Sequence, residues 1–468
     1  MTTQQWRTES DSLGEVQVPA YALWGAQTQR SVQNFAIGNQ RFPMAFIRAF
    51  ALVKKAAALS NYELRKLDKE RSHLIGEACD EIMAGKLDEQ FPLSVWQTGS
   101  GTQTNMNLNE VIANRGNELA GGKRGDNSPL HPNDHVNMSQ SSNDVFPTVM
   151  HVVTAELLDR HLFPAASDML GTLDRKSVEF SSLLKSGRTH MMDATPITLG
   201  QEFQAFHDHI LYAYQQLKDV QPEVQRLAIG GSAVGTGLNT HPDWAGCVAR
   251  QISALTNRKF RPAENHFTAL AGHDVLVDLH GRLNLLATSL FKMAKDLRMM
   301  NSGPRCGLAE VQMPANEPGS SIMPGKVNPT QAEALTMVCL KVMSNYHAVS
   351  MAGSQGHFQL NVYKPLIIHQ LMDSICLLSD AMNSFCRHCL DELRANESQL
   401  AHYVERSLML VTALSPVIGY DQAARVAKHA DENNTSLREA ALALELLSAE
   451  EFDRHVDPTR MLAPQPDE

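Results

Sequence analysis

A loop of unusual composition lies at residues 319–329, which read Gly-Ser-Ser-Ile-Met-Pro-Gly-Lys-Val-Asn-Pro. It combines two hydroxyls, a cation and an amide with glycines and prolines that suit neither helix nor strand. A hydroxyl that takes a proton, beside donors that stabilise the resulting anion, could carry acid–base chemistry. The same residue types are typical of a surface turn, but turn propensity does not account for Met323, Lys326 and Val327. The loop is therefore a functional candidate.

Two further clusters offer donors for an anion. At residues 98–107, small hydroxyl and amide side chains stand among glycines, which suits either carboxylate binding or a turn that caps a helix. At residues 139–144, serines and an asparagine stand at the predicted start of a long helix. The free N–H groups and the positive end of a helix dipole favour an anion there. Ordinary N-capping explains the same residues equally well.

A fourth cluster contains a candidate for proton transfer. His190 lies in a short polar turn between two predicted helices, next to Arg188 and Thr189. Histidine is the usual residue for proton transfer near neutral pH, although a structural role is the commoner one for any of the 19 histidines. Glu333, on the helix predicted after the 319–329 loop, could orient an imidazole. A solvated glutamate on a helix face is the more frequent case.

Together the clusters suit β-elimination from a dicarboxylate. Removing a proton next to a carboxylate produces a doubly charged aci-carboxylate, and each preorganised donor for it is worth about 10²–10³ in rate. Donors of the right types are Lys326, Asn328, Thr102, Ser141 and Asn143. The chemistry needs no cofactor, and the sequence contains no Rossmann fingerprint, Walker loop or metal-ligand cluster.

Long apolar stripes predict the elements that must position these clusters. Steps of three and four residues separate Leu276, Leu279, Leu283, Leu286, Leu290, Met293 and Leu297, and also Ile368, Leu371, Ile375, Leu378, Met382, Phe385 and Cys389. Such stripes are typical of long helices in a bundle, here one that also suits a homo-oligomer. We expect a mixed helical N-terminal domain (1–139), a central helix-bundle domain (140–397) and a small C-terminal helical domain (398–468).

Composition narrows the class of protein. The chain has 468 residues, of which 43% are hydrophobic and 20% charged, as in soluble globular proteins. A formal net charge of -10 argues against non-specific binding to nucleic acid or an anionic membrane. No targeting pattern occurs in residues 1–20, and no stretch is long and apolar enough to span a bilayer. Seven scattered cysteines favour reduced thiols, so we expect a cytoplasmic protein.

These motifs resemble a known group of enzymes. The loop 319–329 resembles the signature of the fumarase/aspartase superfamily, and the four clusters occur in the family's order over almost the whole chain. Within that superfamily, residues 96–107 and 304–308 are similar to the class II fumarate hydratases. Aspartases usually carry Gln in place of His190 and Ala in place of Gly325.

The resemblance implies a fold and an activity. The fold would be mainly α, with three domains and a central long-helix bundle that assembles into a tetrameric core. The activity would be the reversible hydration of fumarate to L-malate in the tricarboxylic acid cycle, without metal or cofactor. A homotetramer would form each active site from three chains. The alternatives are an aspartate ammonia-lyase-type elimination and an inactive structural homologue that keeps the fold.

The resemblance also assigns roles to residues. Ser320 would take the C3 proton of malate, and His190, oriented by Glu333, would serve the hydroxyl side through a water. The substrate would be bound by Ser100, Gly101, Thr102, Ser141, Ser142, Asn143, Thr189, Ser321, Lys326, Val327 and Asn328. A second dicarboxylate site near the surface would comprise His131, Pro132, Asn133 and Asp134. Some relatives carry an arginine shortly before that site. Here the stretch 127–130 reads Asn-Ser-Pro-Leu, and the lack of that cation should weaken anion binding at the second site.

Overall fold

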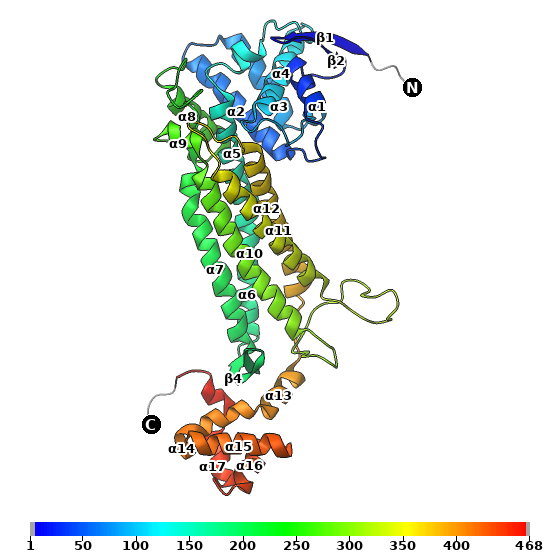
Figure 1. Cartoon of the computed structure of the whole chain (residues 1–468), viewed down its shortest axis with the longest axis vertical. Helices are drawn as coiled ribbons and strands as arrows, with labels where there is room; N and C mark the ends of the chain where they lie inside the picture. Colours follow the sequence, from blue (N-terminus) through cyan, green and yellow to red (C-terminus); the bar gives the residue numbers. More distant parts are fainter. Residues whose placement is uncertain (1–4, 465–468) are drawn as a thin grey trace. The chain divides into compact units, whose positions relative to one another are not determined.

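The computed structural model describes residues 5–464 and is mainly helical, as the apolar stripes predict (Figure 1). The chain divides into two compact units. The first comprises the residues up to Phe163 together with Gln215–Leu285 and Leu340–Leu378, and the second comprises Pro164–Tyr214, Leu286–Cys339 and the residues from Ser379 onward. The three-domain division expected at 139/140 and 397/398 stays a prediction.

Four long helices contribute residues to both units. They are α7 (Leu199–Val224), α10 (Asp274–Met300), α11 (Thr330–Gly353) and α12 (Lys364–Phe385). Every residue of the α10 stripe from Leu276 to Leu297 is at most 1% exposed, and so is every residue of the stripe from Ile368 to Cys389. The heptad-like spacing therefore marks the buried faces of these helices, as predicted.

The first unit carries the two N-terminal clusters of candidate site residues. Its other helices are α1 (Ala26–Asn34), α2 (Met44–Glu63), α3 (Lys69–Met83), α4 (Thr102–Leu119), α5 (Ser142–Leu157), α8 (Trp244–Thr256) and α9 (His266–Ala271). Its strands are the antiparallel pair β1 (Trp6–Asp11) and β2 (Gly14–Pro19), and the parallel pair β5 (Arg226–Leu227) and β6 (Arg261–Pro262).

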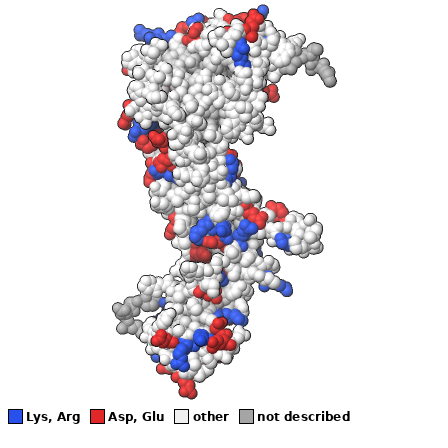
Figure 2. All heavy atoms as spheres, in the orientation of Figure 1, with Lys and Arg blue, Asp and Glu red and all other residues white. Residues whose placement is uncertain are grey.

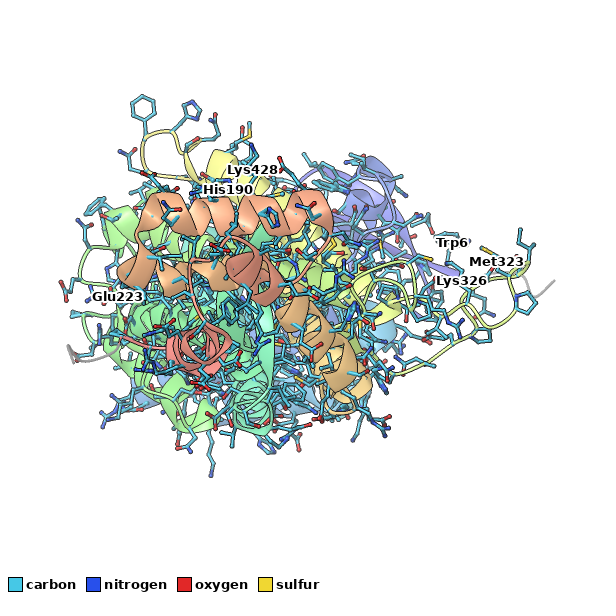
Figure 3. The ribbon with its side chains drawn as sticks, turned by 90° about the horizontal axis from the view of Figure 1, so that it is seen from below. Trp6, His190, Glu223, Met323, Lys326 and Lys428 are labelled. Atoms are coloured by element: carbon cyan, nitrogen blue, oxygen red, sulfur yellow. The ribbon has the colours of Figure 1, made fainter. Side chains whose placement is uncertain are left out.

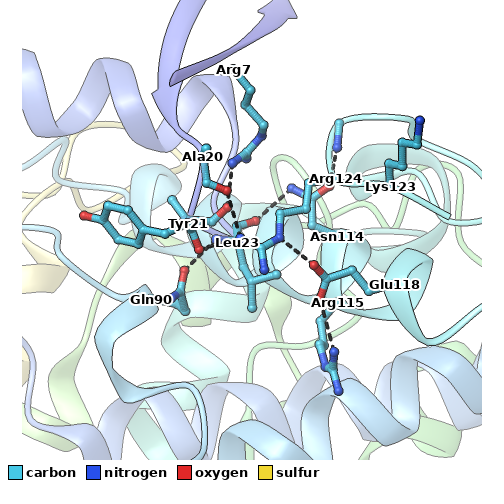
Figure 4. Close-up of polar contacts among 12 residues, drawn as sticks. Arg7, Ala20, Tyr21, Leu23, Gln90, Asn114, Arg115, Glu118, Lys123 and Arg124 are labelled. Atoms are coloured by element: carbon cyan, nitrogen blue, oxygen red, sulfur yellow. Dashed lines mark hydrogen bonds and ion pairs between the residues drawn. The ribbon is translucent and has the colours of Figure 1, made fainter. Parts of the chain in front are cut away.

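The segment after β2 is held by side chains that bind its backbone, one of which is on α4 (Figure 4). The Arg7 guanidinium donates to the carbonyls of Pro19, Ala22 and Trp24, and the Arg124 guanidinium donates to those of residues 20 and 21. On α4, the Asn114 amide donates to the Leu23 carbonyl at 2.8 Å. These bonds satisfy irregular backbone that no sheet or helix pairs, and they brace the helix whose first turn carries one cluster.

The second unit carries the other two clusters. Its helices are α6 (Phe163–Glu179), α13 (Glu397–Arg406), α14 (Ser415–Ile418), α15 (Tyr420–Asn433), α16 (Leu437–Ala443) and α17 (Ala449–His455). Its strands form the antiparallel pairs β3 (Leu184–Thr189) with β4 (Met192–Thr198), and β7 (Val311–Gln312) with β8 (Arg394–Ala395). The C-terminal helices enclose an apolar cluster of their own, which includes Leu414, Val426 and Ala440.

The face shown in Figure 2 carries charges of both signs, which lie beside one another rather than forming one large field of a single sign. Among residues 5–464, no helix combines the length and the apolar character that a membrane span requires.

Candidate active site

The turn before α4 needs its glycine. Gly101 has φ +78°, in the left-handed region, and an added Cβ would lie 2.2 Å from the Phe146 ring. The turn places the hydroxyls of Ser100 and Thr102 2.9 Å apart at the first residue of the helix. Only glycine combines that conformation with so close a neighbour, so residues 100–102 present two adjoining hydroxyls on fixed backbone.

The residues 141–144 form a capping box at the start of α5. The Ser141 hydroxyl oxygen accepts from the Asn143 N–H at 3.2 Å, and the Asp144 carboxylate accepts from the Ser141 N–H at 2.9 Å. The capping interpretation of Ser141 is thus confirmed. Binding of an anion at the same helix start stays a prediction, because capping uses only part of the donors of the first turn.

One amide joins these two clusters. On α4, the Asn105 Nδ2 donates to the Ser142 hydroxyl oxygen at 3.2 Å and to Asn137 Oδ1 at 3.1 Å. The structure therefore brings the two clusters of the first unit together, as carboxylate binding would require.

Asp144 holds these two clusters in place through its buried carboxylate. It was not predicted from the sequence as a functional residue. Its buried carboxylate accepts from the backbone N–H groups of Gly230 and Ser232, at 3.0 and 2.9 Å. Burial raises its pKa to about 6, against the lowering effect of those hydrogen bonds. An acidic residue three positions after Ser141 is the sequence signal of a capping box, and that spacing could have identified Asp144.

His190 lies at the tip of a β-hairpin in the second unit. It falls between α6 and α7, as expected, but its turn joins two strands rather than two helices, because Thr189 pairs with Met192. His190 and Met191 have φ +56° and +66°. Two consecutive positive φ angles suit a tight hairpin turn, and such strain in residues other than glycine is characteristic of functional sites. The His190 side chain is exposed at the tip of this hairpin.

A buried ion network fixes strand β3 of this hairpin. The Arg188 guanidinium lies 2.8 Å from Oε1 of Glu310, whose side chain is fully buried. Lys185 lies 3.4 Å from the other Glu310 oxygen and 2.5 Å from the Glu202 carboxylate. Because a buried carboxylate is stable only when paired, this network determines the position of the strand that leads to His190. Local patterns could not reveal Glu310, which lies 122 positions from Arg188.

The loop 319–329 extends away from the helices of its unit (Figures 1 and 3) and is held by its own hydrogen bonds. Gly319 is bonded to the Lys326 carbonyl at 2.8 Å and to the Asn328 amide at 2.6 Å. The Lys326 ammonium donates to Asn328 Oδ1 at 2.5 Å. The loop therefore keeps its cation and its amide together, with Met323 and Val327 half exposed.

The hydroxyl of Ser320 is contacted by the backbone of its own loop. Its Oγ accepts from the backbone N–H groups of Ile322 and Met323, at 3.3 and 3.0 Å. Two N–H donors aimed at one oxygen stabilise negative charge on it. The role of Ser320 as the base stays a prediction.

Glu333, in the first turn of α11, forms an ion pair with Arg298 of α10 at 3.3 Å. Both side chains are about half exposed. The role of Glu333 in orienting His190 stays a prediction, as do the substrate contacts expected for Thr189, Ser321, Lys326 and Asn328.

The proposed second site adjoins an acidic cavity. His131 caps a short π-helix (Pro132–Val136), and its Nδ1 accepts from the Asp134 N–H at 3.1 Å. The cavity of about 210 Å³ beside it is also lined by Glu9, Asp11 and Glu110. Glu9 is paired with Arg7, and Asp11 with Arg30. Burial raises the pKa of Glu110 to about 7. None of these carboxylates supplies the cation that the missing arginine would provide. The second site stays a prediction.

Comparisons with known proteins cover nearly the whole chain. A family model described as lyase matches residues 14–344, and one described as fumarase C C-terminus matches residues 410–463. The class II fumarate hydratase of Thermosynechococcus vestitus is 58% identical, with 97% of each chain covered. Class II fumarate hydratase 1 of Pseudomonas aeruginosa is 56% identical over 97% of this chain and 98% of that one.

The fold agrees with a solved structure of the same kind. A recombinant class II fumarase from Schistosoma mansoni superposes with a TM-score of 0.96 at 43% identity, covering 98% of this chain and 99% of that one. The fold and the signature loop are thus those of the lyases. Within them, this chain belongs to the class II fumarate hydratase family, which confirms the resemblance and the mainly helical fold.

Proposed function

We propose that this protein catalyses the reversible hydration of fumarate to L-malate, a hydro-lyase reaction of the tricarboxylic acid cycle. The observation that carries this function is the full-length similarity to enzymes named class II fumarate hydratase. His190 and Gly325, two positions at which aspartases usually differ, favour hydration over ammonia-lyase chemistry.

In the direction of elimination, the Ser320 oxygen takes the C3 proton of malate, and the electron pair of the C–H bond moves into the adjacent carboxylate. The resulting aci-carboxylate carries a double negative charge, which Lys326 and Asn328 stabilise. The C2–O bond then breaks as this electron pair forms the double bond, and the hydroxyl accepts a proton from a water held by His190. The hydroxide left by that water is neutralised by the proton that Ser320 releases, so the net products are fumarate and one water.

The donors of the first unit hold the substrate during this reaction. Ser100, Thr102 and the helix start at 141–143 offer hydroxyls, an amide and backbone N–H groups to carboxylate oxygens. Fumarate and malate each carry two carboxylates, and the global net charge of -10 repels such dianions. Dense local donors are therefore necessary for binding.

The working form that we propose is a cytoplasmic homotetramer in which each site takes residues from three chains. Large apolar side chains on α11 support an assembly through the long helices, since Met337, Leu340 and Met351 are 65%, 54% and 70% exposed. Apolar exposure of this kind along one helix is typical of a surface that a partner covers.

A spectroscopic assay tests the activity. Purified protein mixed with fumarate in ammonium-free buffer should lower the ultraviolet absorbance of the substrate, and the product should be L-malate. A decrease that requires ammonium would instead establish an aspartase-type ammonia-lyase, and no decrease under either condition would indicate an inactive homologue.

A further inference from the structure

A buried lysine is connected by hydrogen bonds to the two donor clusters of the first unit, at residues 100–102 and 141–143. It takes no part in the mechanism described above. Lys54 is on α2, and its side chain is fully buried. Its Nζ lies 2.9 Å from Oε1 of Gln140 and 3.2 Å from Oδ1 of Asn137. The Lys54 ammonium thus donates to the side-chain amide oxygens of Asn137 and Gln140, which lie in the turn before Ser141.

Asn137 is the centre of this arrangement. Its Oδ1 accepts from Lys54 and, at 3.1 Å each, from the amides of Asn105 and Asn109 on α4. Its own Nδ2 donates to the Gln140 carbonyl at 3.1 Å. Because Asn105 also donates to the Ser142 hydroxyl, a continuous chain of hydrogen bonds runs from Lys54 to a substrate-binding residue.

Burying an ammonium without full compensation is costly, so its retention here calls for a reason. Burial lowers the pKa of Lys54 to about 7, an effect that its attraction to the Asp144 carboxylate opposes. Asp144 in turn binds the backbone of Ser141, Gly230 and Ser232. Lys54 is therefore coupled to the start of α5 by hydrogen bonds and by charge.

We propose that Lys54 is a positioning residue for dicarboxylate binding. Through Asn137, Gln140 and Asn105, it fixes the helix start at 141–143 relative to the hydroxyls at 100–102. The inference rests on the proposed function, because it assumes that these two clusters bind the carboxylates of the substrate. Lys54 itself lies below the donors and does not contact the substrate.

The test compares two neighbouring lysines. Lys54→Met keeps the length and apolar stem of the side chain but removes the ammonium. The matched control is Lys55→Met, because Lys55 pairs with Asp80 at 2.7 Å, on a carboxylate that is half exposed. For Lys54→Met we expect KM for fumarate and for L-malate, and Kd for succinate from calorimetry, to rise together about tenfold, or about 1.4 kcal/mol. We expect kcat to change less than threefold and Lys55→Met to match the wild type.

If Lys54 had only a structural role, its replacement would lower the melting temperature of the protein and leave KM and the succinate Kd unchanged. Folded Lys54→Met enzyme with KM and succinate Kd within twofold of the wild type would overturn the inference. Gln140→Met provides a second measurement, because Gln140 is partly exposed and its loss removes one acceptor of Lys54 without leaving a buried charge alone. It should raise the succinate Kd about threefold. If Lys54→Met does not fold and Gln140→Met binds succinate normally, the inference is also wrong.

Succinate binding separates this inference from the proposed function, because it needs no turnover. Wild-type protein that binds succinate but does not hydrate fumarate would contradict the function alone, and the variants would still test Lys54. Wild-type protein that neither binds succinate nor hydrates fumarate would overturn both.

Discussion

Ser320, the predicted base, is contacted by the backbone of its own loop. Its hydroxyl oxygen accepts from two backbone N–H groups that follow it directly in the chain. The arrangement depends on a tight turn over residues 320–323, in the same loop that carries Lys326 and Asn328.

Replacing Ser320 should therefore affect turnover more than binding. We expect Ser320→Ala to lower kcat by about 10³-fold with KM changed less than fivefold, because proton transfer is an interaction of the transition state. Steady-state kinetics in both directions measure this. Ser321→Ala is the matched control, and its effect should fall mainly on KM. A large rise in KM for Ser320→Ala at unchanged kcat would contradict its role as the base.

The histidines at 131 and 190 should differ sharply in importance. His131→Asn should leave kcat and KM within about twofold, because the stretch 127–130 lacks the arginine that would bind an anion beside His131. The same change at His190 should lower kcat by about 10²–10⁴-fold, the usual contribution of a proton-transfer group. Both are measured as initial rates at saturating malate. Collapse of activity in His131→Asn would show that the second cluster belongs to the reaction.

At the scale of elements, the long helices contain a buried histidine that makes stability depend on pH. His280 of α10 lies 3.0 Å from the Ser374 hydroxyl of α12 and is fully buried. Burial lowers its pKa to about 4, from 6.5 when exposed. The unfolded chain therefore binds more protons between those values. The stabilisation is complete above pH 6.5 and is lost as the pH falls towards 4.

This linkage predicts the pH dependence of unfolding. Between pH 7.5 and 5, His280 should account for about 2 kcal/mol of lost stability. Urea denaturation of the wild type and of His280→Gln at both pH values measures it, and the variant should lose less stability on acidification. His388→Gln, at an exposed position, is the control and should behave as the wild type does. Equal losses in the wild type and in His280→Gln would contradict the prediction.

The sequence predicts the long helices better than it predicts the buried residues and turns that hold the candidate site in place. The stripes from Leu276 to Leu297 and from Ile368 to Cys389 repeat at helical spacing, so the pattern alone identifies their buried faces. The loop 319–329 was also predictable, because the residues that identify it are contiguous in the sequence. The hairpin at His190 was not predicted, because its turn lacks the Asn-Gly or Asp-Gly that usually marks one.

Buried charged residues could not be predicted for a different reason. Glu310 reaches Arg188 across 122 positions, and Lys54 reaches Gln140 across 86. A charged residue in a sequence is most often exposed, and only the folded chain shows that these are paired inside it. Local sequence patterns therefore do not reveal buried charged residues such as Glu310 and Lys54.

At the scale of the whole molecule, the candidate residues fall into two sets. The clusters at 100–102 and 141–143 belong to one compact unit, and His190 and the loop 319–329 belong to the other. The proposed tetramer combines sets from different chains in each active site. Two variants that are each inactive should then restore activity when they assemble together.

Ser320→Ala removes the base, and Asn143→Asp places a carboxylate where a substrate carboxylate should bind. Each homotetramer should retain less than about 1% of the activity, since one lacks proton transfer and the other repels a dianion. In tetramers assembled at random from equal amounts, about a quarter of the sites would combine an intact 143 from one chain with an intact 320 from another. Coexpression with two affinity tags and assay of the doubly purified protein should therefore recover about a quarter of wild-type activity. The double variant carrying both changes in one chain, coexpressed with itself, must stay inactive. Mixed tetramers without activity would mean that both residues of a site come from the same chain, because each chain then carries one defect into every site that it forms.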